Sequence, residues 1–409
     1  MSAVPCDVAV IGGGSAGVAA AVASARAGAR TVLVERAARL GGNAAQALVH
    51  TICGLYFAAD DDEPQLAHAG LPAEVAARAG GEPERAGKVW YLPVRPDALS
   101  AIYTDLCRAE RGLELRLGAE LARAELGERS RLWLKSDAGA AELDAAVVID
   151  TSGDAAAAEL GGAATEMAAP EELQIPSYVF RLEGVETEQL AGFARLKLGA
   201  ALAGGVRAGA LPPGADAIVV RPSGRPGEVF ATLNLARPEP WAPLDPTCIA
   251  ALERGAHDAA EAIARFLVET RPGFARARLA EHPARLGVRE TRRVRGLERV
   301  TADDVLAGRR REDEVALSTW PIELWSDHRK PHFELPRGPC SVPLGALISR
   351  THPRLGTAGR CLSATHEAHA ALRVIGTALA TGEAIGRAAA FAAARGKALA
   401  EISPAEIRA

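Results

Sequence analysis

The chain has 409 residues, 48% of them hydrophobic and 24% charged, which is the composition of an ordinary globular protein. Lys and Arg number 47 against 51 for Asp and Glu, a formal net charge of −4, so we expect no nucleic acid partner. No run reaches the ~18 apolar residues of a membrane span, and the N-terminus lacks the basic region of a signal peptide. The six cysteines are scattered without metal-ligand spacing. These features favour an α/β protein of enzyme size in a reducing, cytoplasmic compartment, with no bound metal.

The first forty residues predict a β-α-β unit. An apolar run at 7–11 stops at Gly12, as a buried parallel strand does. The Ala-rich segment 18–26 is typical of a helix, and 31–34 is a second apolar strand, closed by Glu35.

The turn between strand and helix carries the G-x-G-x-x-G spacing at Gly12, Gly14 and Gly17. Gly12 makes the tight turn, Gly14 lets the backbone approach a pyrophosphate, and Gly17 lets the helix pack closely on the strand. The first helical turn, which includes Ser15 and Ala16, offers unpaired N–H groups and a partial positive charge to a diphosphate.

Eighteen residues after Gly17 stands Glu35, where an acid at the end of the second strand binds ribose hydroxyls. The same acid would repel the 2′-phosphate of NADP. Strand, glycine turn, helix, strand and acid in this order predict dinucleotide binding. The alternative is a Gly-rich turn in an unrelated α/β fold.

Downstream of Glu35 the sequence resembles the two-dinucleotide-binding-domain flavoproteins, in which the acid is followed shortly by a glycine pair. Here that pair is Gly41-Gly42, with Arg36 before it and Asn43 after it. The apolar run 146–150 leads into Thr151-Ser152-Gly153-Asp154, which is similar to the T-G-D element that these proteins place beside FAD.

The closer resemblance is to the bacterial family of FAD-dependent oxidoreductases, which is distantly related to the fumarate reductase flavoproteins. It rests on three blocks, residues 6–56, 286–293 and 355–394, of which the last is the most specific to the family. The resemblance implies FAD and redox chemistry and leaves the substrate open.

The fold expected on this basis is α/β, with a Rossmann-like FAD-binding domain, a parallel sheet covered by helices, and an inserted α+β substrate domain. We expect a discontinuous FAD domain over 1–155 and 340–409, and a substrate or cap domain over 156–339. The segments 175–185, 217–221 and 228–235 are predicted strands, and 245–270 is a predicted long helix. The acidic run 60–63 predicts a solvated loop.

The fingerprint and the resemblance together give the expected FAD contacts. They are Gly12, Gly14, Ser15, Ala16, Gly17, Glu35, Arg36, Gly41, Gly42, Asn43, Gly153, Asp154, Arg360 and Gly376. Gly376 opens the last Ala-rich helix, whose N-terminus we expect to face the pyrimidine edge of the flavin.

Two features depart from the wider superfamily. Many relatives have Gly-Asp where this chain has Gly359-Arg360, and a positive charge suits a diphosphate better than a ribityl hydroxyl. No second G-x-G-x-x-G follows a strand, and we expect Ala203-Gly204-Gly205 to lie in a polar turn. A second, NAD(P)H-binding domain is therefore not expected, so electrons would come from a substrate or a small mobile donor.

Candidate catalytic groups follow the glycine pair. His50 and Cys53 lie in an apolar segment expected to run along the flavin. Three interpretations stay open: a covalent bond to the flavin, contact with substrate or catalysis, and structural packing.

His366 and His369 stand three residues apart and share one face if they are helical. The resemblance places this segment against the flavin ring, so either of the two is a candidate base. A metal site made with Glu367 is not favoured, because adjacent helical residues face different ways.

Arg289, Arg292, Arg293 and Arg295 form a basic cluster. We expect at least two of them to pair with acids such as Glu290, Glu298, Asp303 or Asp304. Arg289 or Arg292 is a candidate for binding a substrate carboxylate.

The one G-x-S-x-G spacing, at Gly13, Ser15 and Gly17, is part of the dinucleotide turn. The chain contains no H-E-x-x-H or P-loop lysine, so nothing further supports a hydrolase or a kinase. We expect an FAD-dependent dehydrogenase or oxidase that passes a hydride from a small organic substrate to the flavin, and then electrons to an unidentified acceptor. The alternatives are a flavin-dependent reductase of an activated double bond and a non-catalytic flavin-binding redox sensor.

Overall fold

The computed structural model describes residues 3–58, 63–190 and 192–408, so residues 60–62 of the acidic run lie outside the described residues. At its centre is a seven-stranded sheet of order β6-β2-β1-β9-β8-β7, with β20 also paired to β9. Its strands are β1 (Val4–Ile11), β2 (Thr31–Glu35), β6 (Leu113–Leu117), β7 (Ala119–Glu125), β8 (Ser130–Ser136), β9 (Gly139–Asp150) and β20 (Leu355–Thr357).

The centre of this sheet is parallel and one edge is antiparallel. The pairs β1–β2, β1–β9, β2–β6 and β9–β20 are parallel, whereas β7, β8 and β9 form an antiparallel meander. The expected α/β class is confirmed, as are the β-α-β unit and the strand at 146–150. The meander was not predicted.

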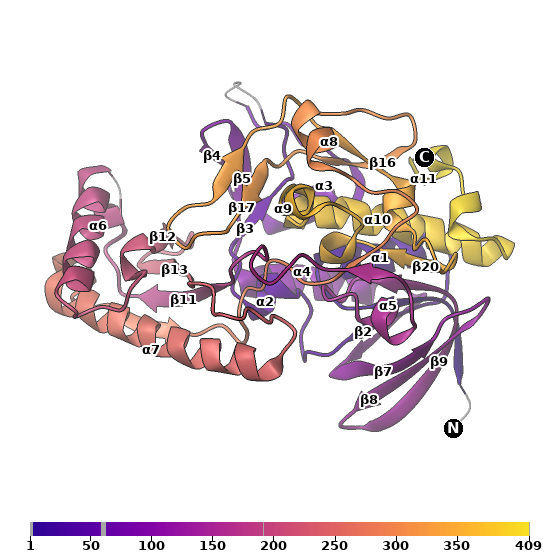
Figure 1. Cartoon of the computed structure of the whole chain (residues 1–409), viewed down its shortest axis with the longest axis horizontal. Coiled ribbons are helices and arrows are strands. Elements are labelled where there is room, and N and C mark those ends of the chain that lie inside the picture. The colour runs from indigo at the N-terminus through magenta and orange to yellow at the C-terminus, as the bar shows by residue number, and fades with distance from the viewer. Residues whose placement is uncertain (1–2, 59–62, 191, 409) are drawn as a thin grey trace.

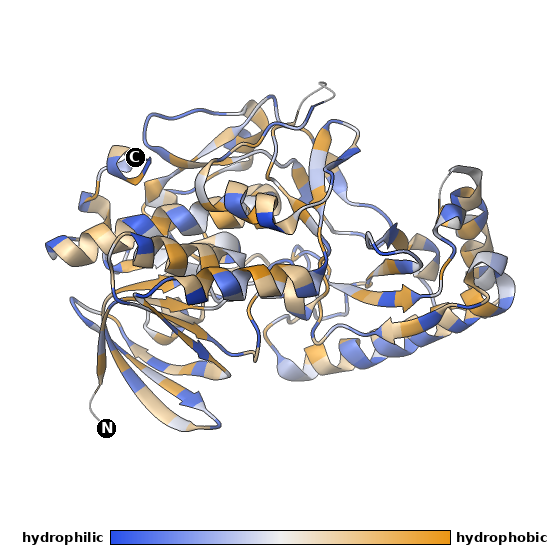
Figure 2. Ribbon diagram, turned by 180° about the vertical axis from the view of Figure 1, so that it is seen from behind, coloured by the Kyte–Doolittle hydropathy of each residue, from blue (hydrophilic) through white to orange (hydrophobic). Residues whose placement is uncertain are grey.

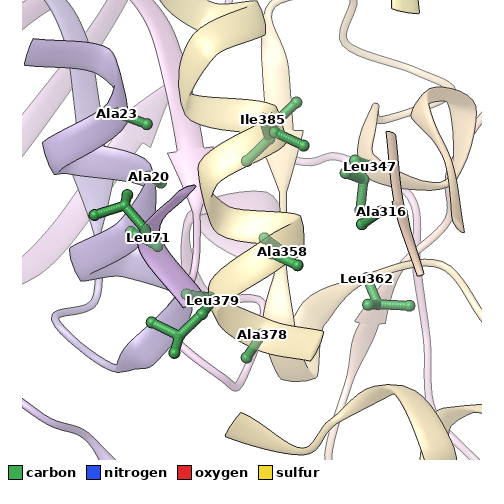
Figure 3. Packing of buried hydrophobic residues seen from close by; sticks show 14 of the residues in the cluster. Ala20, Ala23, Leu71, Ala316, Leu347, Ala358, Leu362, Ala378, Leu379 and Ile385 are labelled. Carbon is green, nitrogen blue, oxygen red and sulfur yellow. The ribbon is translucent and has the colours of Figure 1, made fainter. Parts of the chain in front are cut away.

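Two small-residue helices pack against each other beside the sheet: α1 (Ser15–Arg26) and α10 (Ile375–Arg395). Figure 3 shows them side by side, with Ala20 and Ala23 on one and Leu379 and Ile385 on the other. A Cβ on Gly382 would lie 2.2 Å from the Ala16 carbonyl oxygen, and one on Gly386 would lie 2.3 Å from that of Ala20. The absence of side chains at these two turns therefore sets how close the helices come.

A four-stranded antiparallel sheet of order β12-β13-β11-β14 lies apart from the central sheet. Its strands are β11 (Ser177–Glu183), β12 (Val219–Pro222), β13 (Glu228–Asn234) and β14 (Arg278–Glu281), accompanied by α6 (Gly192–Arg207) and α7 (Pro246–Thr270). In Figure 1, α6 and α7 lie at one end of the longest axis, and β7 and β8 lie toward the other. The predicted strands and the long helix are confirmed within a few residues.

Side chains explain the start and the faces of α7. The Asp245 carboxylate accepts a hydrogen bond from the Thr247 N–H at 2.9 Å and caps the helix. Hydrophilic and hydrophobic residues alternate along its length (Figure 2), because one face packs on the sheet and the other faces water.

The segment Ala203-Gly204-Gly205 lies inside α6, so the expectation of a polar turn there was wrong. Leu198 and Leu202 are buried, which shows that packing overrides the low helix propensity of the glycines.

The remaining elements surround these two sheets. The helices are α2 (Asn43–Gln46), α3 (Gly70–Ala79), α4 (Pro96–Ala109), α5 (Ala156–Leu160), α8 (Ala302–Ala307), α9 (His366–Leu372) and α11 (Pro404–Arg408). A small three-stranded sheet contains β3 (Thr51–Cys53), β5 (Val89–Pro93) and β4 (Glu84–Ala86). Three further sheets have two strands each: β10 (Thr165–Glu166) with β15 (Arg293–Val294), β16 (Glu314–Ser318) with β19 (Cys340–Pro343), and β17 (Ile322–Leu324) with β18 (His332–Glu334).

The apolar interior has separate cores. The largest includes α1, α10 and side chains from 300–348, whereas the four-stranded sheet, α6 and α7 share a core drawn from 178–286. None of the helices in the described part of the chain is long and apolar enough to cross a membrane.

Candidate functional site

The glycine turn has the geometry that its spacing predicts. Gly12 has φ +104°, and a Cβ there would lie 2.6 Å from the Thr151 carbonyl oxygen. A Cβ on Gly17 would lie 1.8 Å from the Gly12 carbonyl oxygen, so α1 packs directly on the turn. Gly14 differs, because its nearest neighbour would be the Gly42 Cα at 3.9 Å. Gly12 and Gly17 are therefore required by the fold, while a Cβ on Gly14 would make only an ordinary van der Waals contact.

The first turn of α1 is available to an anion. Gly14 is the N-cap, and no side chain accepts a hydrogen bond there. Ser15 is held from behind, because the Tyr103 hydroxyl donates to its Oγ at 2.8 Å. Ala16 packs against Gly359 and Gly382. The N–H groups of this turn and the positive end of the helix dipole thus face the glycine pair.

Glu35 links the end of β2 to the glycine turn. Its Oε2 accepts from the Gly13 N–H at 2.6 Å and its Oε1 from the Ala37 N–H at 2.8 Å. This structural role was not predicted. Each carboxylate oxygen keeps a further lone pair, so contact with a ribose stays a prediction.

A cavity opens where the chain leaves β2. It measures about 450 Å³ and is lined by Arg36, Ala37, Ala38, Gln46, Glu120, Ala284 and Arg285. The cavity lies directly beyond Glu35 on the chain.

The glycine pair lies against the turn. Gly41 and Gly42 have φ +122° and +52°, in the left-handed region that favours glycine. The Gly41 N–H donates to the Gly13 carbonyl at 2.8 Å, and a Cβ on Gly42 would lie 3.0 Å from the Gly14 Cα. Asn43 donates from Nδ2 to the Val288 carbonyl at 2.9 Å. The pair therefore forms the second wall of the space above Gly14.

Arg360 ties the T-G-D segment to the last block. Its Nε donates to the Gly153 carbonyl at 2.7 Å and its Nη2 to Asp154 at 2.8 Å. Arg36 approaches the same carboxylate at 3.5 Å, and the Thr291 hydroxyl donates to the Gly153 carbonyl at 2.8 Å. The three blocks named in the sequence thus meet at Asp154.

Gly376 has a packing role that the sequence did not suggest. A Cβ there would lie 2.4 Å from the Gly54 carbonyl, so the first turn of α10 rests on the backbone that follows β3. This contact brings β3 and its neighbours to the N-terminus of α10. A direct contact of Gly376 with the cofactor stays a prediction.

His50 precedes β3 and Cys53 is its last residue, and both are poor at exchanging protons near neutral pH. The His50 ring stacks on Phe230 at 4.7 Å, and its Nδ1 donates to the Leu48 carbonyl at 3.1 Å. Burial lowers the pKa of His50 to about 4. Burial and the charge of Glu323 raise the pKa of Cys53 to about 12. These surroundings favour the packing interpretation for both, and their roles in catalysis stay untested.

The two histidines of α9 have different environments. His369 is fully buried, its Nε2 donates to the Arg360 carbonyl at 3.0 Å, and burial lowers its pKa to about 3. His366 is 15% exposed, and its Nδ1 lies 2.9 Å from the Glu290 carboxylate. Burial would raise the pKa of Glu290, but the hydrogen bond to His366 and the nearby cations lower it to about 2. Glu290 is thus a fixed anion that orients His366.

The basic cluster pairs only in part as expected. Arg293 pairs with Glu290, as predicted. Arg292 pairs instead with Glu159 at 3.0 Å, and Arg295 with Glu166 at 3.6 Å. The expected partners Glu298, Asp303 and Asp304 were therefore wrong for these arginines, because the chain folds back on 159–166. Arg289 has no ion pair among the described residues.

Sequence reasoning missed three side chains near Arg289: Arg373, Gln174 and Glu323. Gln174 and Arg373 are 199 residues apart along the chain, and none of the three residues belongs to a recognisable motif. Only the fold brings them together, between β17 and the start of α10.

One group of described side chains has metal-ligand spacing, namely His257, Glu261 and His282. It lies on α7 and just after β14, outside the glycine turn and α9. The two imidazole rings stack at 3.9 Å with an angle of 18°, so one ion cannot lie in both ring planes without a rotation. Tyr178 and Glu261 already hydrogen-bond His282.

The residues around Gly14 fit FAD. The absence of a side chain at Gly14, the uncapped α1 and Arg36 suit a diphosphate, and Glu35 with the adjoining cavity suits an adenosine. The same set would hold the cofactor through backbone N–H groups, so few charged side chains are needed.

Comparison with solved structures gives matches of low sequence identity. A geranylgeranyl bacteriochlorophyll reductase-like protein of Thermoplasma acidophilum has 14% identity and a TM-score of 0.48, covering 99% of this chain and 82% of that one. p-Nitrophenol 4-monooxygenase of Pseudomonas putida has 13% identity and a TM-score of 0.49, covering 97% and 82%. No curated protein matches the sequence.

The model of one protein family, described as FAD dependent oxidoreductase, matches residues 7–409. That span includes the glycine turn, the T-G-D segment and both helices that pack beside the central sheet. The chain therefore belongs to the FAD dependent oxidoreductase family, and it is an enzyme whose cofactor is FAD.

Proposed function

We propose that this oxidoreductase is a dehydrogenase or oxidase of a small organic substrate, with His366 as the base. The observation that carries the proposal is the His366–Glu290 pair. The Nδ1 of His366 lies 2.9 Å from the buried carboxylate of Glu290, and this contact fixes the imidazole ring. The Nε2 of His366 has no hydrogen bond among the described residues. Such a nitrogen can accept a proton from a substrate O–H or N–H group.

When bound, FAD supplies the two-electron acceptor for the hydride that leaves the substrate carbon. The substrate loses its O–H or N–H proton to His366 Nε2 and gains a C=O or C=N double bond. Glu290 stabilises the imidazolium that results, because its charge is buried and fixed. His369, His50 and Cys53 support this arrangement by packing.

We also propose that 1–155 and 340–409 bind FAD, and that 156–339 forms the substrate side of the site. The glycine turn, α1 and α10 come from the first part, whereas Glu290 and the four-stranded sheet come from the second. His366 donates across this division to Glu290. A mobile acceptor would then reoxidise the flavin.

Anaerobic bleaching of the bound flavin tests the proposal. A panel of alcohols, amines, hydroxy acids and amino acids is added to FAD-loaded protein, and the best substrate is used with variants. His366→Gln should slow flavin reduction roughly 10²- to 10⁴-fold and leave FAD content unchanged. His332→Gln, which changes a histidine that is 63% exposed, should leave the rate unchanged. An unaltered rate in His366→Gln would overturn the assignment of the base.

A further inference from the structure

Arg289 is a cation whose partners are all neutral. Its Nη1 donates to the Ile175 carbonyl at 2.6 Å and its Nη2 to Asn234 Oδ1 at 2.7 Å. Its guanidinium lies 4.8 Å from the ring centre of Trp325. Burial, and then the charge of Arg373, lower the pKa of Arg289 to about 9. The site thus holds two cations close enough to repel each other.

Arg373 is held loosely. Its Nη2 lies 3.4 Å from Gln174 Oε1 and 3.5 Å from the Glu323 carbonyl, and its buried Nε has no hydrogen-bond partner among the described residues. The carboxylate of Glu323, whose charge acts on Arg373, does not pair with it. The carboxylate oxygens of Glu323 accept instead from the indole N–H groups of Trp320 at 2.8 Å and Trp325 at 2.9 Å.

Gln174 adds a second unpaired donor. Its side chain is fully buried, and its Oε1 accepts from the Trp325 N–H at 3.3 Å and from Arg373. Its Nε2 has no hydrogen-bond partner in the part of the chain that the structure describes. Two donors without partners and two arginines without an ion pair among the described residues therefore lie within one cluster. An oxygen anion is the ligand that satisfies all of them.

The cluster is also close to the proposed base. Arg373 directly follows α9, the helix that begins at His366, and the charge of Glu290, the partner of His366, acts on the Arg373 guanidinium. The anion site lies before α10 rather than at α1, where the diphosphate space is. A ligand held by Arg373 would therefore approach His366.

We propose that Arg373, Arg289 and Gln174 bind the carboxylate of the substrate, which makes the substrate class a small 2-hydroxy or 2-amino acid. The inference rests on the proposed function. The carboxylate would accept from the free Nε of Arg373 and the free Nε2 of Gln174, so that the adjacent C–OH or C–NH₂ group reaches His366.

Binding of oxalate to the FAD-loaded protein tests the site without turnover. Oxalate carries the carboxylate but no oxidisable C–H bond, and its binding is followed by the flavin absorbance and by calorimetry. Arg373→Gln and Arg289→Gln should each weaken oxalate binding by about 10- to 100-fold, and Arg373→Lys should weaken it less. Arg276→Gln, which changes an arginine that is 81% exposed, should bind oxalate as the wild type does.

The outcomes separate this inference from the proposed function. Oxalate binding that depends on Arg373, without bleaching by any hydroxy or amino acid, would support the anion site and contradict the oxidation. Bleaching by neutral alcohols or amines at a rate unchanged in Arg373→Gln would support the oxidation and overturn the carboxylate site. Tighter binding of inorganic phosphate than of oxalate would also overturn it. If Arg373→Gln does not fold, oxalate binding by Arg289→Gln and by Arg373→Lys tests the site instead.

Discussion

His369 illustrates how burial converts a titratable side chain into a source of acid sensitivity. Its pKa in the folded protein is about 3, below the ordinary value of ~6.5, because burial disfavours the charged ring. The unfolded chain therefore binds the proton first as the pH falls. The stability that neutral His369 contributes is complete above pH ~6.5 and is lost as the pH falls toward the folded value.

His369→Gln should reduce this dependence, since an amide still donates to the Arg360 carbonyl. Between pH 6.5 and pH 5 the wild type should lose about 2 kcal/mol more unfolding free energy than the variant, measured by urea denaturation. His332→Gln should follow the wild type. Equal losses in wild type and His369→Gln would show that the ring is not neutral in the folded protein.

The cysteines should differ in reactivity for the same physical reason. Cys6, Cys107, Cys340 and Cys361 are buried, and burial raises the pKa of Cys53 to about 12, so thiolate is scarce at each. Cys248 is more exposed than the buried four. A thiol reagent at pH 7.5 should label one site quickly, and Cys248→Ser should abolish that phase while Cys53→Ser keeps it. Fast labelling that disappears in Cys53→Ser would contradict the packing assignment.

Site residues could be predicted where their role depends on a local sequence pattern, and not where it depends on contacts between distant parts of the chain. Gly12, Gly14 and Gly17 were found because their roles depend on neighbours within one turn. Gln174 and Arg373 were not, because their significance lies in unpaired donors that only the folded chain brings together. The contact of Glu290 with His366 was not predictable either. The sequence suggested Glu290 only as a partner of an arginine, and the fold also brings it to His366.

At the scale of the element, the contact between α1 and α10 depends on missing side chains. Gly386→Ala would place a Cβ 2.3 Å from the backbone oxygen of Ala20, and backbone cannot yield as a side chain can. We expect a loss of about 1–3 kcal/mol in unfolding free energy. Gly255→Ala in α7 is the matched control, because its Cβ would meet nothing within 4 Å. It should stabilise by roughly 0.5–1 kcal/mol through helix propensity. A Gly386→Ala variant as stable as the wild type would show that the helices can separate freely.

Elements were predictable where one local pattern dominates. The β-α-β unit and α7 have clear periodicity and breakers, and they were found. The meander β7–β8 escaped because its exposed strands are rich in charge, and their pairing is set by partners along the sheet. The pair Gly204-Gly205 suggested a turn, but the segment is helical in α6 because the apolar face of this helix is buried.

At the scale of the whole molecule, stability and cofactor binding meet at the glycine turn and can be separated there. FAD that binds only the folded chain should add about 2.7 kcal/mol to the unfolding free energy when its free concentration is 100 times Kd. Gly14→Val adds a Cβ whose nearest neighbour would be 3.9 Å away, at a φ of −74° that valine adopts readily. The apoprotein should therefore keep its stability within about 1 kcal/mol.

The same variant should lose FAD affinity by roughly 10- to 100-fold, because the new methyl groups occupy the space before α1 where the diphosphate is expected. Urea midpoints with and without added FAD measure both effects. Gly17→Val is the contrasting case, since a Cβ there lies 1.8 Å from the Gly12 carbonyl oxygen and the apoprotein itself should be destabilised. A Gly14→Val protein that gains as much stability from FAD as the wild type would move the diphosphate away from this turn. Loss of apoprotein stability in Gly14→Val would instead mean that the fold, and not the cofactor, requires glycine at this position.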